Sequence, residues 1–397
     1  MGVRGCHQHL TLGAVCPGHG VPILGRCLNF ALLDDDRPLQ VSWQAAGTGA
    51  RIYMDAAQST GTAGALESSL EGALDRHEED DALALRAPVS AQDDVLITGV
   101  CGRMGKLLTR HLHRERGVIG IDRRPFPDRP KDVVHHQFDL RRKKTQEVLR
   151  SRRVRAVVHL GTMHDMRADP AQRHSWNVVA LQKLTQYALR YGVKKLVVLS
   201  SANVYGPHPE NPQFLSEEAP LLGAQNFSAI RDLMEVDMLA QNFLWKHPEV
   251  ETVVLRPCHI LGRVRNAPSK YLRLRNPVTV WGFDPMVQPI HERDVVSALQ
   301  LALRPGVRGI YNLRGPGELP LSHVLRLLGR TARPLPAWLA KRALRSLWNS
   351  RLGSFPAPEM DHIRFPCMID DTLARNELGF EPRYDMRATL QSVDSDR

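Results

Sequence analysis

Three regularly spaced glycines form the pattern in this chain that says most about chemistry. Gly99, Gly102 and Gly105 follow a short apolar run as G-x-x-G-x-x-G, and Asp122 closes the next apolar run about 20 residues later. The first glycine permits a tight turn, the second lets backbone N–H groups approach a pyrophosphate, and the third lets a helix pack closely on its strand. The pattern predicts a dinucleotide site at a helix N-terminus.

The residues around this loop indicate which dinucleotide binds. Arg103 and Met104 open the helix and are expected beside the phosphates, which the positive end of a helix attracts. Asp122 is placed to accept hydrogen bonds from the adenosine ribose diol, and this favours NAD. Arg123 and Arg124 follow at once and could hold a 2′-phosphate, so NADP stays open as the alternative.

Buried strands alternate with amphipathic helices from residue 93 onward, which is typical of a parallel sheet covered on both faces. Strands are expected at 95–98, 118–122, 133–139, 156–160, 195–200 and 252–256. Helices are expected at 104–116, 144–150, 175–191, 230–247, 322–329 and 336–352. Right-handed crossovers then predict a Rossmann-type doubly wound α/β fold, with its ligand at the carboxyl ends of the strands.

The chain divides into three expected parts. Residues 1–92 hold 6 Lys/Arg against 11 Asp/Glu and show little periodicity, so we predict a poorly ordered extension. Its cysteines and histidines fit no standard zinc spacing, and no metal site is expected. Residues 93–262 form the predicted NAD(P)-binding domain. Residues 263–397 are predicted to form a small C-terminal substrate lobe that also contributes elements to the Rossmann domain.

The composition narrows the class of protein and its partners. A hydrophobic content of 43% with six scattered cysteines suits a soluble protein of the reducing cytoplasm. The net charge of +11 attracts anions, but no recognition motif predicts binding to nucleic acid, and no apolar run predicts a transmembrane segment. A homodimer stays open. The basic amphipathic helix at 336–352 could lie on an anionic membrane, although we favour its packing on the lobe.

Several short motifs follow the glycine loop in a fixed order. They are Asp139-Leu140, His159-Leu160-Gly161-Thr162, Asn177, the stretches 199–206, 255–262 and 290–295, and Glu377-Leu378-Gly379-Phe380-Glu381-Pro382. Together with the loop they resemble the extended short-chain dehydrogenase/reductase family, also called the NAD-dependent epimerase/dehydratase family. The resemblance covers residues 93 to 390 and implies a Rossmann fold and a nicotinamide cofactor.

The resemblance also implies contacts with the cofactor and the substrate. Asp139 and Leu140 would flank the adenine, with the carboxylate accepting from its amino group. Ser201 matches the family's catalytic serine or threonine and would bind the substrate oxygen, whereas a cap of the strand end is the alternative role. The nicotinamide would be lined by residues that follow two strands, namely Leu160, Gly161, Thr162 and Pro257.

The family's tyrosine and lysine, spaced Tyr-x-x-x-Lys, are replaced in this chain. Phe227 stands where the tyrosine is expected and Arg231 stands where the lysine is expected, and no Tyr-x-x-x-Lys occurs between Ser201 and Arg256. Phenylalanine cannot exchange a proton, and an arginine of pKa above about 12 cannot do so either, although Arg231 could still bind the nicotinamide ribose. We therefore expect an atypical active site.

Another group would then have to move the proton. His164 is the first candidate because it stands beside Asp165 in the loop after the fourth strand, where the family faces the nicotinamide. Imidazole titrates near pH 6.5, and a neighbouring carboxylate would raise that value. Tyr205 and His259 are weaker candidates, since each is more often a packed wall residue.

The function predicted from these residues is hydride transfer at a secondary alcohol or ketone carbon. An NAD(P)-dependent oxidoreductase or epimerase is the leading hypothesis, with a small-molecule substrate such as a nucleotide sugar. Dehydratases of the family carry acidic residues after the serine, where this chain has Ala202 and Asn203, and this disfavours dehydration. A non-catalytic NAD(P)-binding sensor or scaffold is the alternative.

Overall fold

A seven-stranded parallel sheet organises the chain. The computed structural model describes residues 93–151, 153–165, 167–224, 230–350 and 357–394. The strand order is β11-β6-β5-β4-β1-β2-β3, and every neighbouring pair runs parallel. The strands are β1 (Asp94–Thr98), β2 (Val118–Asp122), β3 (Val134–Gln137), β4 (Val154–His159), β5 (Lys195–Leu199), β6 (Glu251–Pro257) and β11 (Gly309–Leu313). The order reverses beside β1, so the predicted doubly wound fold is confirmed.

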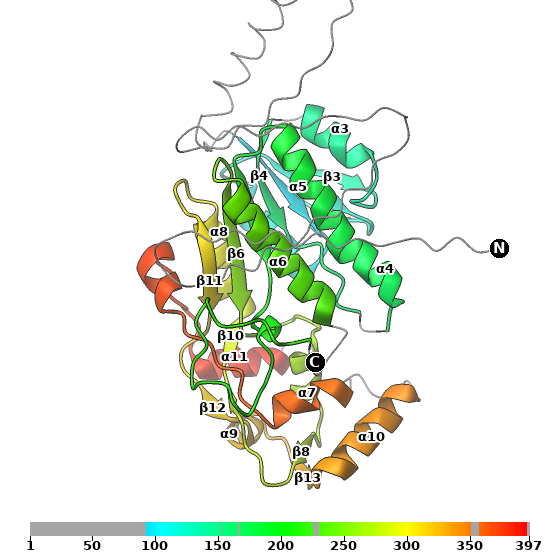
Figure 1. Ribbon diagram of the computed structural model, residues 1–397, viewed down its shortest axis with the longest axis vertical. Helices are drawn as coiled ribbons and strands as arrows, with labels where there is room; N and C mark the ends of the chain where they lie inside the picture. The colour runs from blue at the N-terminus through cyan, green and yellow to red at the C-terminus, as the bar shows by residue number, and fades with distance from the viewer. Residues whose placement is uncertain (1–92, 152, 166, 225–229, 351–356, 395–397) are drawn as a thin grey trace, which may run out of the picture. The chain divides into compact units, whose positions relative to one another are not determined.

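Helices cover both faces of this sheet. One face packs against α3 (Lys144–Ser151), α5 (Ala180–Arg190) and α6 (Arg231–Lys246), which lie side by side in Figure 1. The other face packs against α2 (Arg103–Leu112) and α8 (Glu292–Ala302). The strands supply alternate residues to the two cores, as the pleat requires: Val95 and Ile97 face α2, while Leu96 faces the opposite side.

The C-terminal residues build a lobe with a core of its own. Leu321, Val324, Ala340 and Leu344 are buried in this core, and the lobe extends beyond the carboxyl ends of the main strands (Figure 1). Its helices are α7 (Ala267–Leu272), α9 (Leu321–Leu327), α10 (Ala337–Asn349) and α11 (Met386–Gln391). Its short strands are β7 (His259–Leu261), β8 (Val278–Val280), β9 (Met286–Val287), β10 (Pro289–His291), β12 (Leu319–Pro320) and β13 (Arg333–Leu335).

Two elements of the predicted lobe region return to the sheet. β11 adds an edge strand beside β6, and α8 packs on α2. The predicted helix at 175–191 consists of a π-helical turn, Ser175–Val179, followed by α5. A short helix, α4 (Pro170–His174), precedes this turn. Among the described residues, no helix combines the length and the apolar character needed to cross a bilayer.

Candidate functional site

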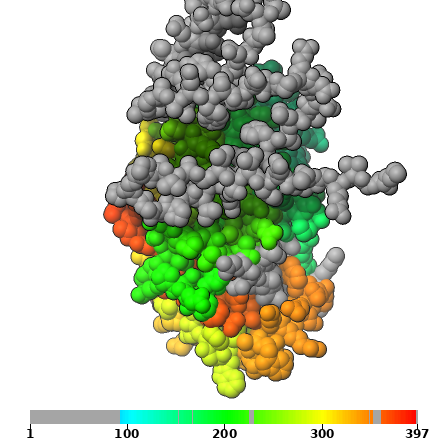
Figure 2. All heavy atoms as spheres, in the orientation of Figure 1, coloured from blue at the N-terminus to red at the C-terminus, as the bar shows by residue number. Residues whose placement is uncertain are grey.

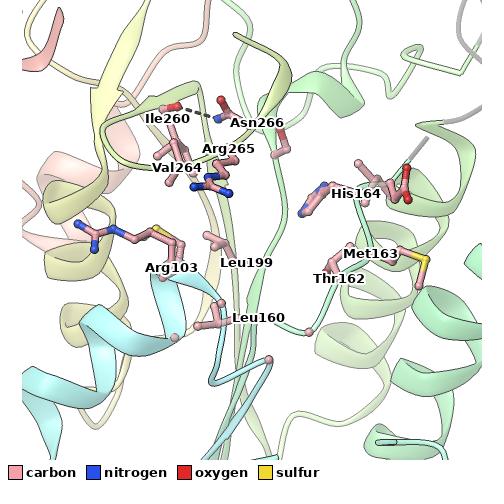
Figure 3. A pocket seen from close by; sticks show the side chains of 18 of the residues that line it. Arg103, Leu160, Thr162, Met163, His164, Leu199, Ile260, Val264, Arg265 and Asn266 are labelled. Carbon is pink, nitrogen blue, oxygen red and sulfur yellow. Dashed lines mark hydrogen bonds between the residues drawn. The ribbon is translucent and has the colours of Figure 1, made fainter. Parts of the chain in front are cut away.

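A cavity of about 1280 Å³ lies at the carboxyl edge of the sheet. Figure 3 shows Arg103 on one side of it and His164 on the other, with Leu160 and Leu199 between them. Residues of the lobe, including Arg265 and Asn266, form a further wall (Figure 3). The cavity therefore joins the sheet edge to the C-terminal lobe.

The glycine loop forms the part of the cavity wall between β1 and α2. Gly99 has φ +71°, and a Cβ atom added there would come within 2.7 Å of the backbone of Gly161. A Cβ atom on Gly105 would come within 2.6 Å of the Gly99 carbonyl oxygen. The first turn of α2 carries no acidic side chain and borders the cavity. The loop thus fits the phosphates of a dinucleotide, because close backbone approach and an uncompensated helix N-terminus are what they require.

Asp122 ends β2 and is surrounded by donors of the protein itself. Its Oδ2 accepts from the Cys101 N–H at 3.1 Å and from Arg124 Nη2 at 3.0 Å. Its Oδ1 accepts from the Arg124 N–H at 3.0 Å and from Arg124 Nε at 3.2 Å. Burial pushes the pKa of Asp122 up, but these hydrogen bonds outweigh it and the pKa lies below its ordinary value. Asp122 is therefore a carboxylate at neutral pH.

Asp139 is likewise engaged by an arginine. Arg141 holds both of its oxygens, with Nη2 2.6 Å from Oδ2 and Nε 3.0 Å from Oδ1. Burial raises the pKa of Asp139, and the hydrogen bonds from Arg141 more than reverse that effect. Asp139 is absent from the cavity wall, whereas Leu140 lines it. A carboxylate held in this way does not present itself to an adenine amino group until Arg141 moves.

Trp176 is a cavity residue that the sequence analysis did not single out. Its Nε1 donates to the Gly161 carbonyl at 2.9 Å, and the Arg123 guanidinium lies 4.0 Å from its ring centre. The side chain therefore links the end of β2 to the loop after β4. Nothing in its spacing signals this role, because it depends on the π-helical turn that carries it.

The loop after β4 is held by one buried amide. Asn177 Oδ1 accepts from the Met163 N–H at 2.7 Å, and Asn177 Nδ2 donates to the Met163 carbonyl at 3.1 Å. The next residue, His164, is exposed to the space of the cavity, although the walls withdraw it from solvent enough to lower its pKa. The predicted upward shift from Asp165 is therefore wrong. The lowered pKa favours the neutral imidazole.

Ser201 follows β5 and faces the same cavity. Its Oγ accepts from the Asn203 N–H at 3.2 Å, so it caps a short 3₁₀ turn, Ala202–Val204. One of its acceptor positions is used by this cap, and the hydroxyl proton is left for another partner. Ser201 therefore does act as a cap at the strand end, which was its alternative predicted role. Its hydroxyl proton can still be donated to a ligand.

Tyr205 belongs to the hydrophobic core and is not among the residues that line the cavity. It is buried, and its hydroxyl lies between Arg256 Nη1 at 2.7 Å and Asn312 Oδ1 at 2.8 Å. Burial raises its pKa to about 12. Its proton is committed to Asn312, and this disfavours Tyr205 as the group that exchanges a proton with a substrate.

Arg231 opens α6 but is not brought into the cavity. It is exposed and is not among the lining residues, although Ile230 and Leu233 on either side of it are. The neighbouring Asp232 is buried and accepts from Arg173 Nε at 2.8 Å, which ties the start of α6 to α4. Phe227 lies outside the described residues.

The lobe wall combines two neutral histidines with several cations. His259 and His362 meet edge to face with their ring centres 5.7 Å apart, and burial lowers their pKa values to about 4 and about 3. Cationic lining residues come from both sides of the cavity: Arg103, Lys106, Arg123, Arg124, Arg167, Arg263, Arg265 and Lys270. The lining carboxylates of the described chain are Asp122, already paired with Arg124, and Asp165. The cavity is therefore suited to an anionic ligand.

Most residues predicted for the site meet at this one cavity. The lining includes Gly99, Gly102, Arg103, Met104, Gly105, Asp122, Leu140, Leu160, Gly161, Thr162, His164, Ser201 and Pro257. Asp139 and Arg231 stand outside it. The two sides of the cavity meet because each motif follows a parallel strand, and such strand ends share one edge.

Known proteins resemble this chain in sequence or in fold. An uncharacterised protein of Mycobacterium tuberculosis (strain ATCC 25618 / H37Rv) is 25% identical over 314 residues, covering 76% of this chain and 82% of that protein. The solved UDP-glucose 4-epimerase of Thermus thermophilus, in complex with NAD, has a TM-score of 0.60 at 20% identity and covers 76% of this chain and 98% of its own. MoeE5, in complex with UDP-glucuronic acid and NAD, has a TM-score of 0.60 at 23% identity, covering 75% and 97%.

A protein-family model matches the chain over most of the sheet and part of the lobe, and this match identifies the family. The model of the NAD dependent epimerase/dehydratase family matches residues 95–313, which is more than half of the chain. The match includes the glycine loop, Ser201 and the edge strand β11. The protein therefore belongs to the NAD-dependent epimerase/dehydratase family, a family of enzymes whose cofactor is NAD, as its motifs predicted.

Proposed function

We propose that this protein is an NAD-dependent oxidoreductase or epimerase acting at a secondary alcohol or ketone carbon of a nucleotide sugar. The observation that carries the proposal is that the phosphate loop, Ser201 and the cationic lobe wall border one cavity. A volume of about 1280 Å³ leaves room for a second ligand beside a dinucleotide. NAD, when bound, accepts and returns a hydride at its nicotinamide ring.

The residues proposed to hold NAD lie along the sheet edge. Backbone N–H groups of Arg103, Met104 and Gly105 would bind the pyrophosphate at the start of α2. Asp122 would accept from the adenosine ribose once Arg124 gives up its hydrogen bonds. The nicotinamide end would contact residues past β4 and β6, namely Leu160, Gly161, Thr162 and Pro257.

The charge of the lobe wall supports a substrate that carries a diphosphate. Arg263, Arg265 and Lys270 line the cavity and belong to the C-terminal part of the chain. Guanidinium groups bind phosphate oxygens through paired, charge-assisted hydrogen bonds. MoeE5 is solved with UDP-glucuronic acid and DesIV of Streptomyces venezuelae is described as a dTDP-glucose 4,6-dehydratase, so a uridine or thymidine diphosphate sugar is the class that we propose.

Two residues are proposed to handle the oxygen and its proton. The Ser201 hydroxyl would donate to the substrate oxygen, since its acceptor side is used by Asn203. His164 borders the cavity and its lowered pKa favours the neutral form, so it would accept the hydroxyl proton as the alcohol is oxidised and return it on reduction. This assignment replaces the phenol that is missing at Phe227.

The proposal is tested by turnover of nucleotide sugars with purified protein. Cofactor absorbance at 340 nm and mass spectrometry of the products are followed with UDP- and dTDP-sugars and NAD. Ser201→Ala and His164→Gln should each lower kcat by about 10²-fold or more. Asn211→Ala serves as the control for a general loss of packing. The side-chain amide of Asn211 donates hydrogen bonds to the Gly206 and Pro366 carbonyls, and Asn211 is not among the residues that line the cavity.

The alternative of a non-catalytic NAD-binding module predicts a different outcome. NAD would bind with no turnover of any sugar, and the double variant Phe227→Tyr with Arg231→Lys would create activity by supplying the family's dyad. Full activity of the Ser201→Ala protein would contradict the catalytic assignment without touching the binding of NAD.

A further inference from the structure

The lobe carries a concentration of exposed aromatic side chains at its outer end. Trp281 is 74% exposed and Trp338 is 70% exposed, and Phe283 and Leu339 are exposed beside them in sequence. Single exposed apolar residues are ordinary, but two tryptophans left in water beside a phenylalanine and a leucine are not. These four residues are called the aromatic tip.

The backbone holds the parts of this tip together. β8 pairs with β13, and the Trp281 N–H donates to the Leu335 carbonyl at 2.9 Å, three residues before Trp338. Trp281 and Phe283 flank Gly282, which has φ +81° and open space around it, and the Phe283 N–H closes the turn on the Val280 carbonyl. In Figure 1 β8, β13 and the start of α10 lie together at the end of the lobe remote from the sheet, and Figure 2 shows that end in space-filling form.

The apolar face of α10 is not available for docking. Ala340 and Leu344 are buried in the lobe core, which confirms the predicted packing of this helix. Trp338 and Leu339 belong to its first turn and stay outside that core. The tip is therefore a separate surface at the end of the helix.

The chain segments that carry the tip are rich in cations, of which Arg330 is paired with Asp394. Residues 263–283 contain five Lys/Arg and residues 319–350 contain six, and neither stretch contains an Asp or Glu. Arg263, Arg265 and Lys270 line the cavity, and six of the other cations are exposed: Arg275, Arg326, Arg333, Lys341, Arg342 and Arg345. The nearest following carboxylate, Asp284, accepts from both the N–H and the hydroxyl of Ser322. These segments thus combine the exposed aromatic residues of the tip with exposed cations.

We propose that the aromatic tip docks on the surface of an anionic lipid bilayer. Tryptophan is favoured at the level of lipid headgroups, where its ring is buried and its N–H stays wet, and surrounding arginines and lysines meet anionic headgroups. Charge complementarity favours an anionic surface over an uncharged protein partner. The phosphate backbone of duplex nucleic acid offers no apolar surface to Trp281 and Trp338, whereas unpaired bases do, so single-stranded RNA is the alternative that the test below separates.

Vesicle flotation of the full chain tests this docking. The protein should float with vesicles of phosphatidylcholine mixed with phosphatidylglycerol and should stay in the dense fraction with phosphatidylcholine alone. Trp281→Ser combined with Trp338→Ser should weaken binding by about tenfold or more. Lys341→Glu combined with Arg342→Glu should weaken it by at least about tenfold, since each cation near an anionic surface contributes about fivefold.

Matched control variants show whether the effect on vesicle binding is specific to the aromatic tip or follows from losing any exposed tryptophan or any pair of cations. Trp245→Ser removes a tryptophan that is 71% exposed on α6, and Arg142→Glu with Lys143→Glu reverses two exposed cations near α3. Both control proteins should float like the wild type, and all variants should unfold at the wild-type temperature.

Absence of flotation on anionic vesicles overturns the proposal, and so does an equal loss in the control proteins. Tight binding of single-stranded RNA that disappears in the tip variants, with no binding to vesicles, would instead assign the surface to nucleic acid.

Discussion

Arg124 donates side-chain hydrogen bonds to both carboxylate oxygens of Asp122, at 3.2 Å from Nε and 3.0 Å from Nη2. Together with the N–H groups of Cys101 and Arg124, these bonds use about four acceptor positions, which is the capacity of a carboxylate. The Arg124 side chain is 62% exposed and can leave, whereas Asp122 is buried. Ribose hydroxyls and the guanidinium therefore compete for the same oxygens.

Removal of this competitor should strengthen the binding of NAD. In Arg124→Ala the two oxygens of Asp122 keep only their backbone donors, so we expect the Kd for NAD to fall by about threefold to tenfold. The Kd for NADP should rise, because one of the two arginines expected to hold a 2′-phosphate has been removed. Isothermal titration calorimetry with both dinucleotides measures the two changes, with the exposed Arg150→Ala as the control. Equal weakening for both dinucleotides would show that Arg124 contributes only general attraction.

The tight turn at Gly99 should tolerate no side chain. In Gly99→Ala the added Cβ atom would lie 2.7 Å from the Gly161 backbone, so the loops after β1 and β4 must separate. The φ angle of residue 99 is also positive, which is unfavourable for alanine. We expect the free energy of unfolding to fall by about 2–4 kcal/mol. We also expect that NAD binding is no longer measurable. Urea denaturation and calorimetry test both effects.

Gly306→Ala is the matched control for this variant. Gly306 has φ +80°, with no atom within 4 Å of an added Cβ, so the strain of the backbone is present without the clash. It should cost about 1 kcal/mol and leave NAD binding unchanged. If the two variants behaved alike, the φ angle rather than the contact with Gly161 would explain the effect.

The sequence predicted the sheet edge well because strand ends carry local signals. Gly99 and Ser201 each stand directly after a buried apolar run, and parallel strands bring such positions to one edge. Asp139 shows where this reasoning stops: its position was foreseen, but its capture by Arg141 depends on a side-chain rotamer that no spacing encodes. The lobe wall was missed for a related reason, because His362 meets His259 across about a hundred residues of intervening chain.

The buried pair of Arg256 and Asp237 should be a main support of the serine loop. Arg256 Nη2 lies 2.6 Å from Asp237 Oδ1, and Ser200 donates to Oδ2 of the same carboxylate at 2.5 Å. Asp237→Asn leaves the guanidinium without its buried counter-charge and should lower the free energy of unfolding by about 3–5 kcal/mol. Asp128→Asn, at an exposed pair with Lys106, should leave the free energy of unfolding almost unchanged. Chemical denaturation compares them, and a small effect at Asp237 would mean that water reaches the pair.

Buried His159 should make the protein less stable as the pH falls. Burial lowers its pKa to about 4 from an ordinary 6.5, so between these values the unfolded chain takes up a proton that the folded chain does not. The contribution is complete above pH 6.5 and is lost towards pH 4, with an upper size of about 3 kcal/mol. His159→Gln should flatten this part of a plot of unfolding free energy against pH, whereas His323→Gln, at an exposed position on α9, serves as the control. An unchanged slope in His159→Gln would assign the pH dependence to other groups.

Asn177 should act as a positioning residue for the loop that carries His164. The buried side-chain amide of Asn177 forms hydrogen bonds with both the N–H and the carbonyl of Met163. Asn177→Ala therefore leaves two backbone groups without these hydrogen-bond partners. We expect a loss of about 2–3 kcal/mol in stability and about tenfold weaker binding of NAD, because Gly161 and Thr162 belong to the same loop. Hydrogen exchange separates positioning from general destabilisation: the Met163 amide should lose its protection under native conditions while the amides of β4 keep theirs. Ser175→Ala, on the same π-helical turn, removes only the bond from Arg141 and should leave the Met163 amide protected. A Met163 amide that stays protected in Asn177→Ala would mean that the loop is held by its other contacts, with the Trp176 bond to Gly161 as the first to examine.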